Sequence, residues 1–134
     1  MENYTLTYLD NLRVKAIHER SQAEIITDAP VDNQGQGSAF SPTDLLCTAL
    51  ASCMITIIGI IAKRNAIDIK GLKAELAKYM SEEPRRVKEI VVKLHFPKKE
   101  YSQKEKIIFR RAVEYCPVAL SLHPDIKKTI HFVF

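Results

Sequence analysis

An uncharged run of 18 residues, from Leu45 to Ala62, constrains this chain more than any other feature of its sequence. At 1.5 Å per residue, a helix of this length could cross the hydrocarbon core of a bilayer. The run also contains Thr48, Ser52 and Gly59, which make it only moderately apolar, and segments typical of β-strands lie on both sides of it. A helix that is apolar on all sides in a soluble fold has to be covered on all sides. We therefore expect a buried central helix and no membrane.

The start of this helix is specified by a recognisable capping sequence. Ser41 can cap the first turn, Pro42 suits the first helical position, and Asp44 stands where a capping-box acid reaches back to the cap amide. These features predict a helix from Ser41 to about Asn65.

The other segments predict strands and one further helix. Partial alternation and turn residues indicate strands over Tyr4–Leu9, Leu12–Glu19, Ala23–Thr27, Lys70–Tyr79, Val87–Phe96 and Ile126–Phe134. The segment 70–79 also fits a helix. The last strand is expected to place Lys128, Ile130, Phe132 and Phe134 on one side.

A second capping box, Ser102 with Glu105, predicts the start of the further helix. Helical spacing places a set of later residues near one face of it: Ile108, Ala112, Tyr115 and Cys116.

This order of elements predicts an α+β fold in which antiparallel sheets pack against helices. The 134 residues suit a single domain, 1–134. A domain of this size has difficulty covering a long apolar helix by itself, so we expect a homodimer whose sheets enclose two such helices.

Composition excludes several classes of protein. The chain is 46% hydrophobic and 27% charged, as in ordinary globular proteins. Its net charge of +4 comes from scattered Lys and Arg without interleaved aromatic residues, so we expect no nucleic-acid partner. The N-terminal segment lacks the pattern of a signal peptide, which predicts a cytoplasmic protein with reduced thiols.

Three cysteines carry the remaining chemistry. Cys47 and Cys53 are six residues apart, hence about 120° apart around a helix, so only one of them can face a given site. Cys116 follows 63 positions after Cys53 and precedes a proline. The chain has no CxxC pair, no HExxH and no histidine at a spacing typical of a metal site, and no hydrolase signature. Each cysteine could also be a small buried hydrophobe.

The segment SPTDLLCTALASCMI (Ser41–Ile55), the turn Thr27–Pro30 before it and the segment Tyr115–Val118 together resemble the OsmC/Ohr family of thiol peroxidases. The resemblance covers essentially the whole chain. It implies an OsmC-like fold, an intertwined homodimer around the central helix, and no prosthetic group or metal. It also implies an enzyme that reduces organic hydroperoxides to alcohols, with Cys53 as peroxidatic and Cys116 as resolving cysteine, regenerated by an external dithiol.

The same resemblance implies an arginine that stabilises the Cys53 thiolate and bonds to an acid at the start of the long helix. Arg13 is the candidate arginine, with Arg20 as the alternative, and Asp44 matches the acid. Asp44 is one carbon shorter than the glutamate usual in the family, and its capping role is an equally good account of it.

Two further alternatives stay open. Cys116 either ends the helix before it, where the dipole disfavours a thiolate, or caps a new turn at Pro117, where a thiolate is favoured. The chain as a whole could instead be a non-enzymatic module that binds a small apolar ligand or thiol.

Overall fold

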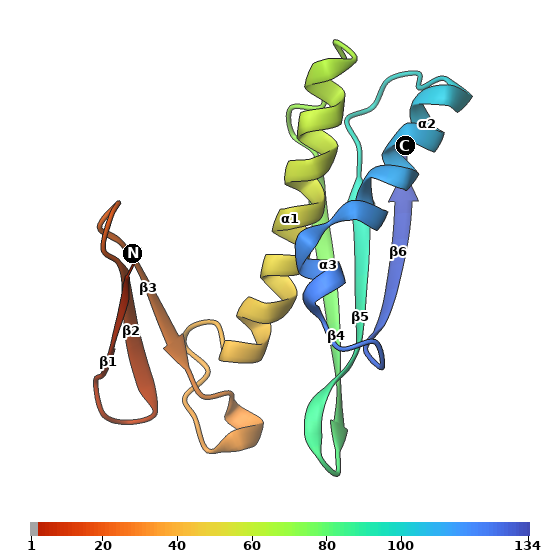
Figure 1. Ribbon diagram of the computed structural model, residues 1–134. Coiled ribbons are helices and arrows are strands. Elements are labelled where there is room, and N and C mark those ends of the chain that lie inside the picture. The colour runs from red at the N-terminus through yellow and green to blue at the C-terminus, as the bar shows by residue number, and fades with distance from the viewer. Residues whose placement is uncertain (1–2) are drawn as a thin grey trace. The chain divides into compact units, whose positions relative to one another are not determined.

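The computed structural model describes residues 3–134, which form two compact units that divide after Leu46. Each unit contains one three-stranded sheet, and the elements mix helices with strands (Figure 1). The expected α+β class is confirmed. The prediction of one domain over the whole chain stays a prediction.

The first unit contains an antiparallel sheet in which the strands follow one another in order. The strands are β1 (Tyr4–Tyr8), β2 (Arg13–His18) and β3 (Ala23–Asp28). A short 3-10 turn, η1 (Val31–Asn33), follows β3. The register of β2 and β3 places Arg13 opposite Asp28.

The second unit contains a sheet with the order β4–β5–β6, formed by β4 (Lys73–Glu82), β5 (Arg85–His95) and β6 (Lys127–Val133). The segment that fits both a strand and a helix is therefore a strand. β4 and β5 form an antiparallel hairpin, but β5 and β6 are parallel, which corrects the expectation of wholly antiparallel sheets. The helices between β5 and β6 carry the chain back to the end where β5 began, so β6 runs in the same direction.

The long helix α1 (Pro42–Arg64) begins as its sequence predicts. The Ser41 N–H donates to Asp44 Oδ2 at 2.9 Å, and the Asp44 N–H donates to Ser41 Oγ at 3.1 Å. This reciprocal pair is a capping box, so the predicted helix start is confirmed.

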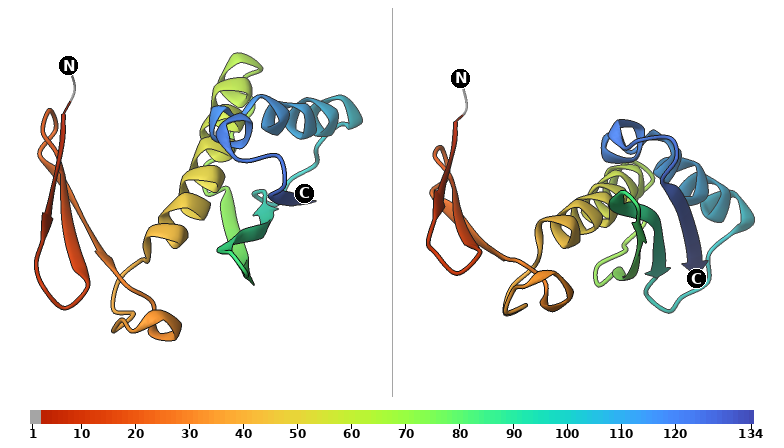
Figure 2. Two further views of the ribbon diagram at one scale, coloured as in Figure 1. Left: turned by 60° about the horizontal axis from the view of Figure 1, so that its bottom comes forward. Right: turned by 90° about the horizontal axis from the view of Figure 1, so that it is seen from below.

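From Cys47 onward, α1 lies on the same face of the β4–β5–β6 sheet as the later helices (Figures 1 and 2). Leu50, Met54 and Ile58 are at most 2% exposed and belong to one apolar core with Ile90 and Leu94 of β5. From Ile90 to Leu94 alternate residues of β5 are buried, which is the period of a strand with one covered face.

Only one face of α1 is buried within the chain. Among its apolar residues, Leu46 is 37% exposed and Ile60 is 43% exposed. By length and composition alone α1 could cross a membrane, but the core helix of a soluble protein meets the same criteria. The expectation of a helix buried all round is therefore not met by a single chain.

The second helical region is shorter than expected. α2 (Gln103–Ala112) starts at the predicted Ser102–Glu105 capping box. The chain then forms a 3-10 turn, η2 (Val113–Tyr115), and a short helix, α3 (Pro117–Ser121). The buried residues are Phe109, Ala112, Val113 and Cys116. Tyr115, predicted on this face, is 72% exposed, because the chain leaves the α-helical path at Val113.

Replacing Phe109 with Ala should destabilise the protein by about 3 to 5 kcal/mol, because the side chain is fully buried in the core. Replacing Tyr115 with Ala, the matched aromatic control on the same segment, should cost less than about 0.5 kcal/mol. Urea unfolding of both variants measures the difference. Equal losses of stability would contradict the assignment of the buried face.

Candidate functional site

Cys53 lies in the middle of α1 and is partly buried. Cys47, one and two-thirds turns earlier on the helix, is 3% exposed and belongs to the core. The six-residue spacing therefore separates the two thiols as predicted. Of the two, only Cys53 is accessible enough to meet a substrate.

Cys116 joins η2 to α3 and is fully buried. Its backbone is extended (φ −63°, ψ 115°), and Pro117 is the first residue of the new helix. Its Sγ accepts a hydrogen bond from the Ala119 N–H at 3.4 Å and donates toward the Leu50 carbonyl of α1 at 3.9 Å. Of the two alternatives, Cys116 therefore caps a new turn.

The fold brings Cys53 and Cys116 into contact although 63 positions separate them. Burial raises the pKa of Cys116, and a hydrogen bond to the Cys53 side chain raises it further, while the Ala119 amide opposes both effects. Cys116 consequently keeps its proton at neutral pH. The pair thus combines a partly accessible sulfur with a buried, protonated neighbour.

Arg13 is held by residues of its own unit. Its Nε and Nη2 donate to the two carboxylate oxygens of Asp28 at 2.7 and 2.9 Å, and Nη2 also donates to Ser38 Oγ at 2.7 Å. The bond to Asp28 raises the pKa of Arg13. Together with the Ser38 hydroxyl, Arg13 holds the pKa of the Asp28 carboxyl far below its ordinary value. This bidentate geometry fixes the plane of the guanidinium.

The predicted roles of Arg13 and Asp44 at Cys53 stay predictions. The Asp44 carboxylate accepts the Ser41 amide in the capping box, as its alternative reading proposed. Arg20 lies in the turn that joins β2 to β3.

Sequence reasoning missed Asp28 and Ser38 as partners of Arg13. A signal was available, because a tight turn between β2 and β3 fixes a register in which positions 13 and 28 are opposite each other. No comparable pattern in the sequence indicated Ser38 as a partner of Arg13. Its position depends on the loop after β3, where the Gly35 and Gly37 amides donate to the Pro30 and Ala29 carbonyls.

Gly35 is required for this loop to close. A Cβ at that position would lie 1.7 Å from the Ala29 carbonyl oxygen, well inside any tolerable contact. The loop then returns Ser38 to Asp28, where the Ser38 N–H donates to the carboxylate at 3.1 Å.

An apolar groove of about 300 Å³ lies between α1 and β4 and includes Ser52, the residue before Cys53. The other residues that line it are Thr48, Ala51, Ile55, Thr56, Ala74 and Leu76. Within residues 3–134, no three His, Cys, Asp or Glu side chains are grouped so that they could hold a metal ion.

The chain therefore has an α+β fold that holds one partly accessible thiol next to one buried thiol. These features place it among proteins whose site is built on cysteine. The sequence model for "OsmC-like protein" matches residues 35–131, and the chain belongs to this family. The OsmC-like fold and the resemblance to OsmC and Ohr proteins are thereby confirmed.

Several solved structures are similar to this chain. A Psychrobacter arcticus protein, named for an osmotic stress induced and detoxification response, is 52% identical, with a TM-score of 0.94 over 98% of this chain and 96% of that one. The Legionella pneumophila organic hydroperoxide resistance protein OsmC is 14% identical (TM-score 0.75; 100% and 97% covered). OhrB of Bacillus subtilis is 13% identical (TM-score 0.70; 98% and 97% covered). The last two share the fold. Comparison with curated proteins gives no match.

The ion pair at Arg13 should make stability depend on acid pH. Because the pKa of Asp28 is lowered in the folded state, its stabilisation is complete above the unfolded value of about 3.9 and is lost as pH falls below it. The urea midpoint should therefore drop between pH 6 and pH 3 more in the wild type than in Asp28→Asn. The exposed Asp125→Asn is the control and should behave as the wild type does. An unchanged pH response in Asp28→Asn would contradict the assigned role of this carboxylate.

Proposed function

We propose that the chain is a thiol-dependent peroxidase that reduces organic hydroperoxides to alcohols through Cys53 and Cys116. The placement of the buried Cys116 beside Cys53, whose side chain raises the Cys116 pKa, is the observation that carries the proposal. The membership of the OsmC-like family and the names of the neighbours from Legionella and Bacillus support hydroperoxides as the substrate class.

In the first step the Cys53 thiolate attacks the terminal oxygen of the hydroperoxide. An S–O bond forms, the O–O bond breaks, and the alkoxide leaves as the alcohol after taking a proton. Cys53 is thereby oxidised to a sulfenic acid. Arg13, whose guanidinium is held by Asp28, is proposed to stabilise the thiolate, and Asp44 is proposed to contribute from the start of α1.

In the second step Cys116 attacks the Cys53 sulfenic acid. A disulfide forms, and the hydroxyl leaves as water with the proton of Cys116. An external dithiol then reduces the disulfide by exchange and is itself oxidised. We place this cycle in the cytoplasm, where such reductants keep thiols reduced.

The groove between α1 and β4 is proposed to receive the alkyl part of the substrate. Its lining is mainly apolar and includes Ser52 and Ile55, which lie on the same turns of α1 as Cys53. Such a surface favours alkyl hydroperoxides over the small, strongly hydrated hydrogen peroxide.

A binding module without turnover is the second candidate. The complete burial of Cys116 favours it, because buried thiols are generally unreactive. In that reading the same groove would bind a small apolar molecule and the two sulfurs would stay reduced.

Replacing Cys53 with Ser should abolish turnover of cumene hydroperoxide with dithiothreitol as reductant, since the two thiols that remain are buried. Cys116→Ser should retain one stoichiometric oxidation per chain. Cys47→Ser is the matched control and should keep the wild-type rate, because the Cys47 thiol is buried and inaccessible to a substrate. Retention of turnover in Cys53→Ser would eliminate the mechanism, and an inert wild type would favour the binding module.

A homodimer is proposed as the assembly in which this chemistry occurs. Large apolar side chains stay exposed in the single chain on the first sheet and on α1, among them Tyr4, Leu6, Ile25 and Ile60. Soluble monomers rarely leave such surfaces open. Light scattering of the protein as it leaves a size-exclusion column should give twice the mass of one chain at micromolar concentration. The mass of a single chain would contradict the dimer.

A further inference from the structure

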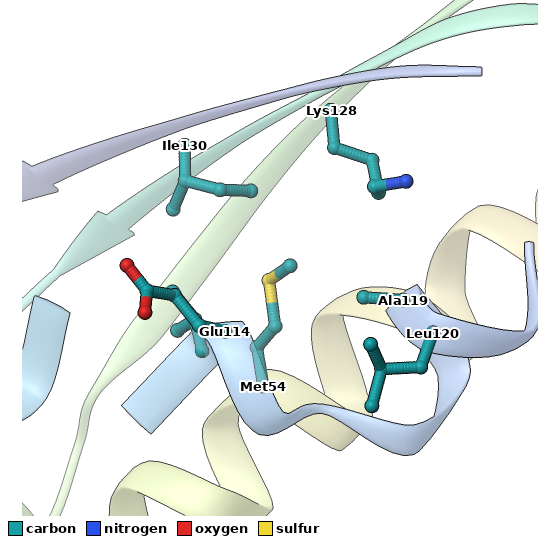
Figure 3. Close-up of a pocket in the computed structure, with 7 residues that line it drawn as sticks. Met54, Glu114, Ala119, Leu120, Lys128 and Ile130 are labelled. Atoms are coloured by element: carbon teal, nitrogen blue, oxygen red, sulfur yellow. The ribbon is translucent and has the colours of Figure 1, made fainter. Parts of the chain in front are cut away.

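A second cavity, of about 250 Å³, lies in the C-terminal unit, apart from the groove between α1 and β4 (Figure 3). Its walls come from α1, η2, α3 and β6. The apolar residues are Met54, Val113, Ala119, Leu120 and Ile130.

The cavity has one charged group at each end. Figure 3 shows the Lys128 ammonium and the Glu114 carboxylate at opposite ends of the apolar lining. Lys128 is half-buried, and no ion pair or side-chain hydrogen bond holds its ammonium among the residues that the structure describes. Its neighbour Lys127, in contrast, is exposed and lies 3.6 Å from Glu89.

We propose that this cavity binds a medium-chain carboxylate, with the apolar chain against Met54 and Leu120 and the carboxylate at Lys128. The volume supports an apolar group larger than benzene, which fits a cavity of about 150 Å³. A single ammonium suits a monoanion. A phosphate, with about −1.5 to −2 charges, would leave part of its charge uncompensated.

The cavity shares a wall with the buried thiol. Ala119 lines the cavity, and its N–H donates to Cys116 Sγ. Val113 also lines it, and its carbonyl accepts the Cys116 N–H at 3.3 Å. Cys116 is buried, so a reagent reaches it only when η2 or α3 moves, and a ligand bound between these elements and α1 opposes that movement. The site thus couples a bound carboxylate to the reactivity of the second thiol.

The test measures octanoate binding to the full, reduced chain by calorimetry. We expect saturable one-to-one binding, weaker binding of octylamine, which has the same chain and the opposite charge, and none of acetate. Lys128→Met should weaken octanoate binding roughly tenfold, because it removes the charged partner but keeps the length of the side chain. Lys127→Met is the matched control and should bind as the wild type does. Ala119→Leu, which fills the cavity, should abolish binding in a protein that still folds by circular dichroism.

A second readout follows the coupling to Cys116. At an octanoate concentration ten times its dissociation constant, alkylation of Cys116 by iodoacetamide should slow about tenfold, since opening must compete with binding. Absence of saturable binding, equal binding by Lys128→Met, or an unchanged alkylation rate would each overturn the proposal. Octanoate is not an oxidant, so these results are independent of whether the chain turns over hydroperoxides.

Discussion

The packing of one face of α1 against the β4–β5–β6 sheet is the constraint on which the thiol site depends. Leu50, Met54 and Ile58 enter the core, and this fixes the rotation of the helix about its axis. Cys53 then lies at the edge of the buried face, partly accessible, while Cys47 lies within it. If the helix were rotated by about 100°, the angle of one residue, the solvent exposure of Cys53 would pass to a neighbouring residue.

The second thiol depends on the same packing. The Leu50 carbonyl of α1 accepts a hydrogen bond from the Cys116 thiol, so α1 itself positions the buried sulfur. The turn between η2 and α3 supplies the opposing contact, the Ala119 amide. Burial and the neighbouring sulfur keep the pKa of Cys116 raised, which distinguishes this buried thiol from the partly accessible Cys53.

Much of this arrangement follows from local sequence. The capping boxes at Ser41 and Ser102 fix the starts of α1 and α2, because they satisfy backbone amides within four residues. The contact of Cys53 with Cys116 could be anticipated only through the family resemblance, since no local pattern joins residues 63 positions apart.

Features that depend on long-range pairing were predicted less well. The parallel pairing of β6 with β5 is decided by the path of the intervening helices and not by the strand sequences. Tyr115 does not lie on the buried face, because the chain leaves the α-helix for a 3-10 turn at Val113. Asp28 became the partner of Arg13 through the cross-strand register and a loop that only Gly35 permits.

The contact of Cys53 with Cys116 is the central claim, and one titration tests it directly. Reduced protein is mixed with one equivalent of cumene hydroperoxide, quenched within seconds, and its thiols are mapped by mass spectrometry. A disulfide between Cys53 and Cys116 with Cys47 unmodified is the expected product. Three unmodified thiols, or a disulfide that includes Cys47, would contradict it.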